Sequence, residues 1–220
     1  MLKFRRYKDR ILNCIEMGFG DTWAVTSYLL RMSEELKKPI RVHTVNSKFK
    51  NDVKAIIPHL DSPGEINFVD QAAQMGMEYC KPYSVKFVPT KKQWNPSANI
   101  VAYQFDGNHL NVKKNLPPGA LASLINSLNS LGYEPVDVGH KKSISFIIDT
   151  LSQCNFFIGC PSGIGIASMS VGNPIYLITR NINPQYVAYM KNCHYVTRQD
   201  VQMFRCVEDF LCPRKVLRLL

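Results

Sequence analysis

The chain has 220 residues, of which 45% are hydrophobic and 20% are charged, which is the balance of an ordinary globular protein. No apolar run approaches the ~20 residues that a membrane-spanning helix requires. The formal net charge is +10 at pH 7, and the basic first residues are not followed by the apolar core of a signal peptide, so we expect an intracellular, cytoplasmic protein.

The positive charge predicts attraction to polyanions such as nucleic acid, an anionic membrane face or nucleotide phosphates. The basic residues are spread along the chain, so a diffuse surface that only keeps the protein soluble remains the alternative. The seven cysteines are odd in number and form no CxxC pair, which argues against a zinc site and a disulfide framework. We expect most of them to be small buried hydrophobic residues, and we expect no metal site.

The first half of the chain alternates strand and helix patterns. A glycine turn over 17–22 opens a helix that runs to about Lys37, and Pro39 marks a stop before the next strand. The apolar positions of this helix predict buried side chains at Trp23, Val25, Leu29, Leu30 and Met32. The other elements expected here are strands over 11–16, 41–46, 66–69 and 84–88, a short helix over 51–57, and a polar linker over 91–97.

The second half repeats this alternation. The elements expected are strands over 99–105, 134–138, 156–159 and 175–178, a polar loop over 106–116, helices over 117–131 and 143–153, and an irregular, helical tail. Strands that alternate with helices imply parallel sheets with right-handed crossovers. We therefore expect an α/β fold of two facing Rossmann-like domains, residues 1–96 and 97–220, with ligand bound in a cleft between them at the carboxyl ends of both sheets.

The segment 156–178 has the pattern of a strand, a tight turn, a short helix, a turn and a strand. Ser162 stands where the helix begins and is a good N-cap residue, and Gly172 ends the helix. A helix that begins at the carboxyl edge of a parallel sheet offers free N–H groups and the positive end of its dipole. We therefore predict an anion site, most often a phosphate site. The alternative is that the small residues only allow close packing.

Two further glycine turns fall at the carboxyl ends of predicted strands, Gly18-Phe19-Gly20-Asp21 and Gly139-His140. None of the three turns is a GxGxxG dinucleotide motif or a GxxxxGK[ST] phosphate loop. The hypotheses that the chain is a nicotinamide-dependent dehydrogenase or an ATPase therefore lose their main support.

The Gly18–Asp21 turn leads into an apolar helix, residues 155–174 contain the Ser-Gly helix start, and the strand over 101–106 is followed by Lys113 and Lys114. Together these segments resemble the heptosyltransferase-like glycosyltransferases. The chain departs from the family pattern at Pro161, where the family usually has Asp, and at Ile166, where it usually has His. The resemblance implies a GT-B fold, a nucleotide-sugar donor on the C-terminal domain, an acceptor on the N-terminal domain, and no obligatory metal or other cofactor.

Glycosyl transfer needs a base that takes the proton from the acceptor hydroxyl. The resemblance implies that Asp21 is this base, and Asp21 stands in the glycine turn where the cleft is expected. The alternative is that Asp21 caps the following helix. Gly18 and Gly20, in the same turn, are expected to lie against the acceptor or a phosphate.

The leaving diphosphate also needs stabilisation. Helix N–H groups near Ser162 and Gly163, with a cation from Lys113 or Lys114, could supply it without a metal, although the two lysines would equally suit a solvated loop. The remaining contacts expected are Gln104 and Asp106 as sugar or supporting contacts, His140 facing the nucleotide or serving a structural role, and Arg180 as a phosphate or acceptor contact.

A compact basic transferase suits a polyanionic soluble acceptor. We expect double-stranded DNA with hydroxymethylated bases, as in bacteriophage DNA glycosyltransferases, where the enzyme extrudes the base and neutralises phosphates with Lys and Arg. A lipopolysaccharide-type glycosyltransferase, a nucleotide-sugar epimerase of GT-B shape, and a non-catalytic nucleic-acid-binding module remain the alternatives.

Overall fold

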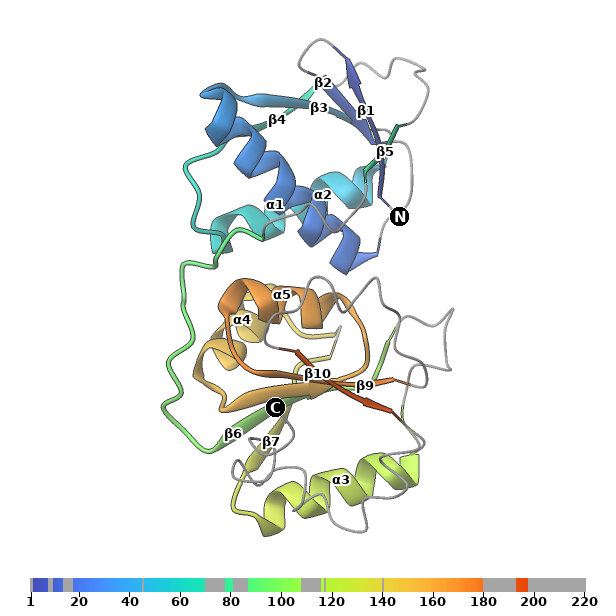
Figure 1. The fold of residues 1–220 in the computed structure, drawn as a ribbon, viewed down its shortest axis with the longest axis vertical. Helices are drawn as coiled ribbons and strands as arrows, with labels where there is room; N and C mark the ends of the chain where they lie inside the picture. Colours follow the sequence, from blue (N-terminus) through green and yellow to red (C-terminus); the bar gives the residue numbers. More distant parts are fainter. Residues whose placement is uncertain are drawn as a thin grey trace.

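Two five-stranded sheets and the helices between and beside them form the computed structural model, in which the two sheets lie one above the other (Figure 1). The structure describes residues 2–7, 10–13, 18–44, 46–69, 78–80, 87–107, 116, 118–139, 141–179 and 193–197. In the strands over 2–7, 10–13, 78–80 and 193–197 it describes the backbone.

The first sheet is mixed and has the order β4-β3-β2-β1-β5. Its strands are β1 (Leu2–Tyr7), β2 (Arg10–Asn13), β3 (Ile40–Thr44), β4 (Ile66–Val69) and β5 (Glu78–Cys80). Strands β2, β3 and β4 are parallel, as predicted, whereas β1 runs antiparallel to both β2 and β5. The prediction of a wholly parallel sheet beginning at residue 11 was wrong. The first segment forms a strand although it is rich in charged residues, and this strand pairs antiparallel with β2, with Tyr7 opposite Arg10.

Two α-helices cover this sheet, α1 (Phe19–Leu36) and α2 (Ser47–Ile56), and a single 3-10 turn, η1 (Ile57–His59), follows α2. Helix α1 ends as predicted, with Lys37 in the left-handed conformation at φ 51°. All five side chains expected to be buried in α1 are buried. Helix α2 begins earlier than predicted because the Asn46 side chain accepts a hydrogen bond from the Phe49 N–H at 3.1 Å and so caps it.

The second sheet is wholly parallel, as predicted, with the order β10-β9-β8-β6-β7. Its strands are β6 (Ile100–Gln104), β7 (Glu134–Asp137), β8 (Phe156–Gly159), β9 (Ile175–Thr179) and β10 (Cys193–Thr197), and its helices are α3 (Pro118–Ser130), α4 (Ile144–Gln153) and α5 (Gly163–Val171). Helix α3 covers one face, while α4 and α5 cover the face toward the first sheet (Figure 1). The prediction of a helical tail was wrong over β10, which extends the sheet.

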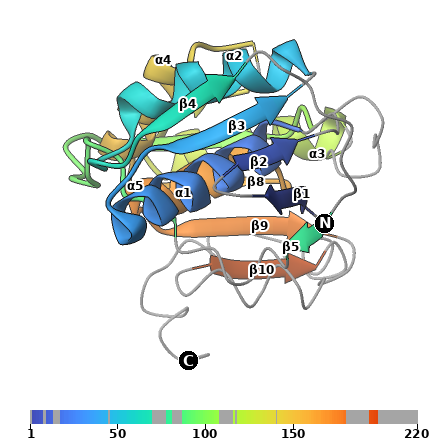
Figure 2. The ribbon, with the colours of Figure 1, turned by 90° about the horizontal axis from the view of Figure 1, so that it is seen from above.

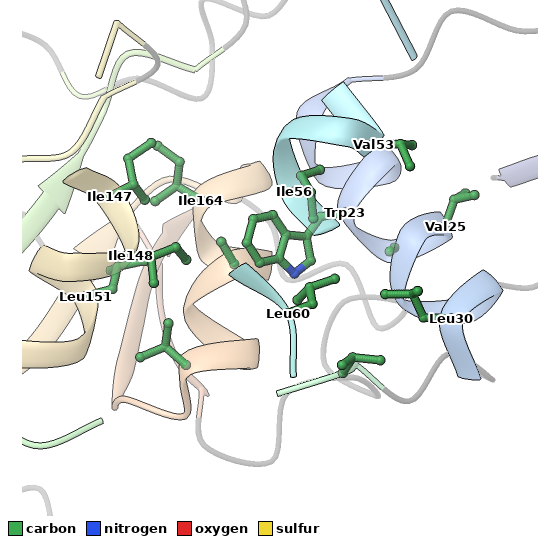
Figure 3. Packing of buried hydrophobic residues seen from close by; sticks show 14 of the residues in the cluster. Trp23, Val25, Leu30, Val53, Ile56, Leu60, Ile147, Ile148, Leu151 and Ile164 are labelled. Atoms are coloured by element: carbon green, nitrogen blue, oxygen red, sulfur yellow. The ribbon is translucent and has the colours of Figure 1, made fainter. Parts of the chain in front are cut away.

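The two halves meet through their helices. The indole of Trp23 in α1 is fully buried, and its Nε1–H donates to the Ser170 hydroxyl of α5 at 2.9 Å. Figure 3 shows this indole between Leu60 of the first half and Ile148 and Ile164 of the second, and one core cluster contains all of these side chains. A ligand-binding cleft between the halves, at the carboxyl ends of both sheets, stays a prediction, and along α1 and α5 the halves are packed against each other.

The segment predicted as a linker is tied to the second half. Its backbone N–H groups donate to the last carbonyls of α5 and α4: Trp94 to Val171 at 3.2 Å, Asn95 to Ser152 at 2.7 Å, and Ser97 to Gln153 at 3.3 Å. Thr90, just before the segment, donates to Ser170 at 2.9 Å. These bonds satisfy carbonyls that a helix leaves without partners at its end. The strand predicted over 84–88 is not formed at residues 87 and 88, and 84–86 lie outside the described residues.

Candidate functional site

The amino ends of α1 and α5 lie on the same side of the molecule. Each helix follows a strand of its own sheet, α1 after β2 and α5 after β8, and begins where the carboxyl ends of the parallel strands lie. In Figure 2 the arrowheads of β3 and β9, one from each sheet, point to the same side. The turn before α1 and the turn before α5, which were both predicted as parts of the site, therefore lie on the same side of the molecule.

Gly20 and Gly163 are the point of closest approach between the two helices. A Cβ atom added at position 163 would lie 2.4 Å from the Gly20 nitrogen and 2.8 Å from Cδ1 of Phe19. A Cβ atom added at position 20 would lie 2.7 Å from the Gly163 Cα. Both positions therefore require glycine, so the close-packing interpretation of these glycines holds for the contact between the helices.

Asp21 follows Gly20 in the first turn of α1 and is exposed. The N-cap position of α1 is Gly18, which leaves the helix without a side-chain cap, so Asp21 does not fill the capping position. Within the described part of the chain, no hydrogen bond or ion pair holds the Asp21 carboxylate. Its negative charge suits the amino end of a helix.

Ser162 occupies the N-cap position of α5 but does not cap it. The hydroxyl group donates instead to Oε1 of Gln104, a side chain that is only 2% exposed at the end of β6. The prediction that Ser162 caps the helix was wrong, because a buried amide 58 positions away competes for its hydroxyl. The first N–H groups of α5 are consequently left without a side-chain cap.

Gln104 also reaches Asp106, and this pair explains the third glycine turn. The Gln104 Nε2 donates to Oδ1 of Asp106 at 2.8 Å. The Asp106 carboxylate lies over Gly139, where an added Cβ would stand 2.4 Å from its Oδ2. The sequence indicated a turn at Gly139 but gave no sign that the missing side chain makes room for Asp106. The preceding residue of β6, Tyr103, packs against a hydrophobic cluster within the second half, and burial and the Asp137 charge raise the pKa of its phenol.

Four predicted site residues, Lys113, Lys114, His140 and Arg180, lie outside the described residues. The expectation of buried cysteines is confirmed at Cys154 and Cys160. In the stretches that the structure describes, no group of three His, Cys, Asp or Glu side chains is placed to hold a metal ion. Among the described helices, none is both long and apolar enough to cross a membrane.

No protein-family model and no curated protein matches this sequence. Among solved structures, a family 9 glycosyltransferase from Veillonella parvula matches with a TM-score of 0.60 and 11% identity, over 91% of this chain and 90% of that chain. The iron-containing dodecameric glycosyltransferase TibC from enterotoxigenic Escherichia coli matches with a TM-score of 0.57 and 16% identity, over 79% of this chain and 59% of TibC.

A second TibC structure, described as a heptosyltransferase in complex with ADP-D-beta-D-heptose, matches with a TM-score of 0.51 and 14% identity, over 79% of this chain and 58% of that chain. The chain thus spans about three fifths of TibC and nearly the whole of the Veillonella protein. At these identities the likeness is one of fold. The chain is similar in structure to the heptosyltransferase-like, family 9 glycosyltransferases that its sequence segments resemble.

Proposed function

We propose that this chain is a glycosyltransferase that moves a sugar from a nucleotide-sugar donor to an acceptor hydroxyl. The observation that carries the proposal is the meeting of α1 and α5 at Gly20 and Gly163, which sets an exposed carboxylate beside a helix end without a side-chain cap. The similarity in fold to family 9 glycosyltransferases supports it. In this proposal residues 1–96 bind the acceptor and residues 97–220 bind the donor, in the two-domain GT-B arrangement.

Asp21 acts as the general base. It accepts the proton of the acceptor hydroxyl while that oxygen forms a bond to the anomeric carbon of the donor sugar. The bond between the anomeric carbon and the phosphate oxygen breaks, and the nucleoside diphosphate leaves with the electron pair. Gly18 is exposed at the start of the same turn and lets the acceptor approach the carboxylate, whereas Gly20 is buried and serves the contact between α1 and α5.

The leaving diphosphate is bound at the amino end of α5, by the N–H groups from Gly163 onward. Lys113 and Lys114 supply positive charge, His140 faces the nucleotide, and Arg180 contacts a phosphate or the acceptor. Since these groups neutralise the charge without a metal, we expect transfer to persist in the presence of EDTA.

ADP-heptose is the first donor to try, because TibC, which shares the fold, was solved with ADP-D-beta-D-heptose. The matching acceptor is a glycan of the kind that heptosyltransferases extend. A hydroxymethylated base in DNA is the second acceptor, favoured by the net charge of +10. Transfer to DNA would weaken steeply with added salt, whereas transfer to a neutral glycan would not.

The test is the Asp21→Asn variant, assayed by mass spectrometry against a panel of nucleotide sugars with both acceptors. Without a base, the transfer rate should fall by about 10²- to 10⁴-fold while the dissociation constant of the donor stays unchanged. Asp61→Asn, at an exposed carboxylate of the same half, is the matched control and should leave transfer intact.

Full transfer by Asp21→Asn would remove Asp21 from the mechanism. Conversion of the donor to another nucleotide sugar, with no acceptor present, would instead indicate an epimerase. Binding of nucleic acid without any turnover of nucleotide sugars would indicate a non-catalytic module.

A further inference from the structure

Ser162, Gln104 and Asp106 form a continuous line of hydrogen bonds along the carboxyl edge of β6 and β8. The Ser162 hydroxyl and the Gln104 side-chain oxygen are bonded, and the Gln104 amide nitrogen reaches Asp106 at 2.8 Å. The middle member is nearly inaccessible to water, at 2% exposure, while Ser162 and Asp106 are half-buried. Such a line has a direction, because each of its groups either donates or accepts.

Asp106 fixes that direction. An ionised carboxylate can only accept hydrogen bonds, so Gln104 must turn its NH₂ group toward Asp106 and its carbonyl oxygen toward Ser162. The Cys160 thiol, 3.8 Å from the same carbonyl oxygen, is also a donor and agrees with this orientation. The Ser162 hydroxyl must therefore give its only proton to Gln104.

This has two consequences for Ser162. Its oxygen retains lone pairs but no proton, so it can accept a hydrogen bond from a sugar hydroxyl but cannot donate one to a phosphate. Because the hydroxyl is drawn toward β6, it also leaves the first N–H groups of α5 uncapped, although serine at this position normally bonds to one of them.

We propose that Gln104, oriented by Asp106, is a positioning residue that directs Ser162 to a hydroxyl of the donor and keeps the amino end of α5 open for the diphosphate. This inference rests on the proposed function. It assigns the two parts of the donor to different groups: the diphosphate to the backbone of α5 and one sugar hydroxyl to Ser162. Gly139 supports this arrangement, since its lack of a side chain leaves the space that the Asp106 carboxylate occupies.

Titration calorimetry with a nucleoside diphosphate and with the matching nucleotide sugar separates the two parts. Ser162→Ala should weaken binding of the nucleotide sugar by about 3- to 10-fold and leave the nucleoside diphosphate unaffected. Gln104→Met keeps the volume but frees the Ser162 hydroxyl to cap α5, so binding of both ligands should weaken. The double variant Gln104→Met/Ser162→Ala should recover the nucleoside diphosphate affinity, because no hydroxyl remains to compete for the N–H groups.

Recovery in the double variant is the decisive result, since a merely structural Gln104 would leave both the single and the double variant weak. Loss of nucleoside diphosphate binding in Ser162→Ala would equally overturn the proposal. Hydrogen exchange of the free protein gives a readout without ligand: the amides of Ile164 or Gly165 should exchange more slowly in Gln104→Met than in the wild type. Suppose that the wild type binds no nucleotide but that these amides still exchange more slowly in Gln104→Met. The proposed function would then be refuted, whereas the control of the Ser162 hydroxyl by Gln104 would stand.

Discussion

Gly163 has no space for a methyl group on the side that faces α1. The atoms that a Cβ would meet are the backbone nitrogen and Cα of Gly20 and a ring carbon of Phe19, so relief requires the two helices to move apart. The Phe19 ring in turn packs edge-on against Trp23, with ring centroids 5.6 Å apart. A change at position 163 therefore reaches the interface between the halves as well as the proposed donor site.

Gly163→Ala should lower the free energy of unfolding by about 1–3 kcal/mol, because it forces packed backbone apart. Gly165→Ala is the matched control in the same helix, since a Cβ there would stand 3.5 Å from Cδ2 of Leu177, an ordinary contact. Without strain, that change should stabilise the protein by about 0.4–1 kcal/mol. Urea unfolding measures both, and equal effects at the two positions would show that the helices do not meet as closely as described.

The candidate site could be predicted at some residues and not at others, for physical reasons. Asp21 and the glycines stand out because a glycine turn after a strand is a local signal. The true partner of Ser162 could not be found, because the capping preference is local whereas Gln104 approaches through the pairing of β6 with β8. The catalytic role of Asp21 and the contacts of Lys113 stay predictions.

At the scale of elements, the ends of α4 and α5 form a polar joint with the start of β9. The Ser168 hydroxyl donates to Oδ1 of Asn173 at 2.5 Å, and the Asn173 Nδ2 lies 3.4 Å from the Cys154 sulfur. The Trp94 indole N–H donates to the Cys154 carbonyl at 2.8 Å, which attaches the connecting segment to the joint. Ser168, Asn173 and Cys154 are buried, so these bonds satisfy polar groups that water does not reach, whereas Trp94 is exposed.

Burial raises the pKa of the Cys154 thiol from 9.0 to about 11, and the hydrogen bonds from its surroundings offset only part of this effect. The folded state thus holds the thiol proton more tightly than the unfolded state. The resulting stabilisation is fully present below pH 9 and is lost as the pH rises from 9 to 11, because only the unfolded chain ionises in that window.

Between pH 9 and 11, the free energy of unfolding of the wild type should therefore fall by about 2 kcal/mol more than that of Cys154→Ala, which has no thiol to titrate at this position. Urea titrations at several pH values measure the difference, and groups that titrate in both proteins cancel. Parallel pH profiles for the two proteins would show that the thiol is accessible to water.

Most elements could be predicted because their signals are local: periodicity in α1, Ser143 capping α4, and Gly132 and Gly172 in positive φ where α3 and α5 end. Strands β1, β5 and β10 could not, for different reasons. Strand β5 has only three residues, Glu78–Cys80, too few for a periodic pattern. Charged residues break the apolar alternation in β1, and β10 follows a long segment without a clear pattern. Strand pairing across the sheet, not local preference, decides such segments.

At the scale of the whole molecule, one hydrophobic cluster joins the two halves, while a second cluster, around Leu124 and Leu128 of α3, lies within the second half. The cluster that contains Trp23, Val42 and Phe49 of the first half also contains Ile148, Leu151 and Leu177 of the second. The boundary predicted at residues 96 and 97 divides the chain at a segment bound to the second half, and that division stays a prediction. Separating the halves would expose the apolar faces of α1 and α5 to water, at a cost of about 25 cal/mol for each Å².

We expect the protein to unfold in one step for this reason. The two tryptophans serve as probes, because Trp23 is buried between the halves and Trp94 lies in the segment that connects them. Tryptophan fluorescence should change at the same urea concentration as the far-ultraviolet circular dichroism, which reports the helices of both halves. Trp94→Phe isolates the Trp23 signal at the interface.

Residues 1–96 and 97–220, produced separately, should each aggregate or lack fixed tertiary structure, since each would leave its side of the shared cluster uncovered. A fluorescence transition that precedes the loss of secondary structure would mean that the halves part before they unfold. In that case the contact between α1 and α5 would act as an opening hinge and not as a fixed core.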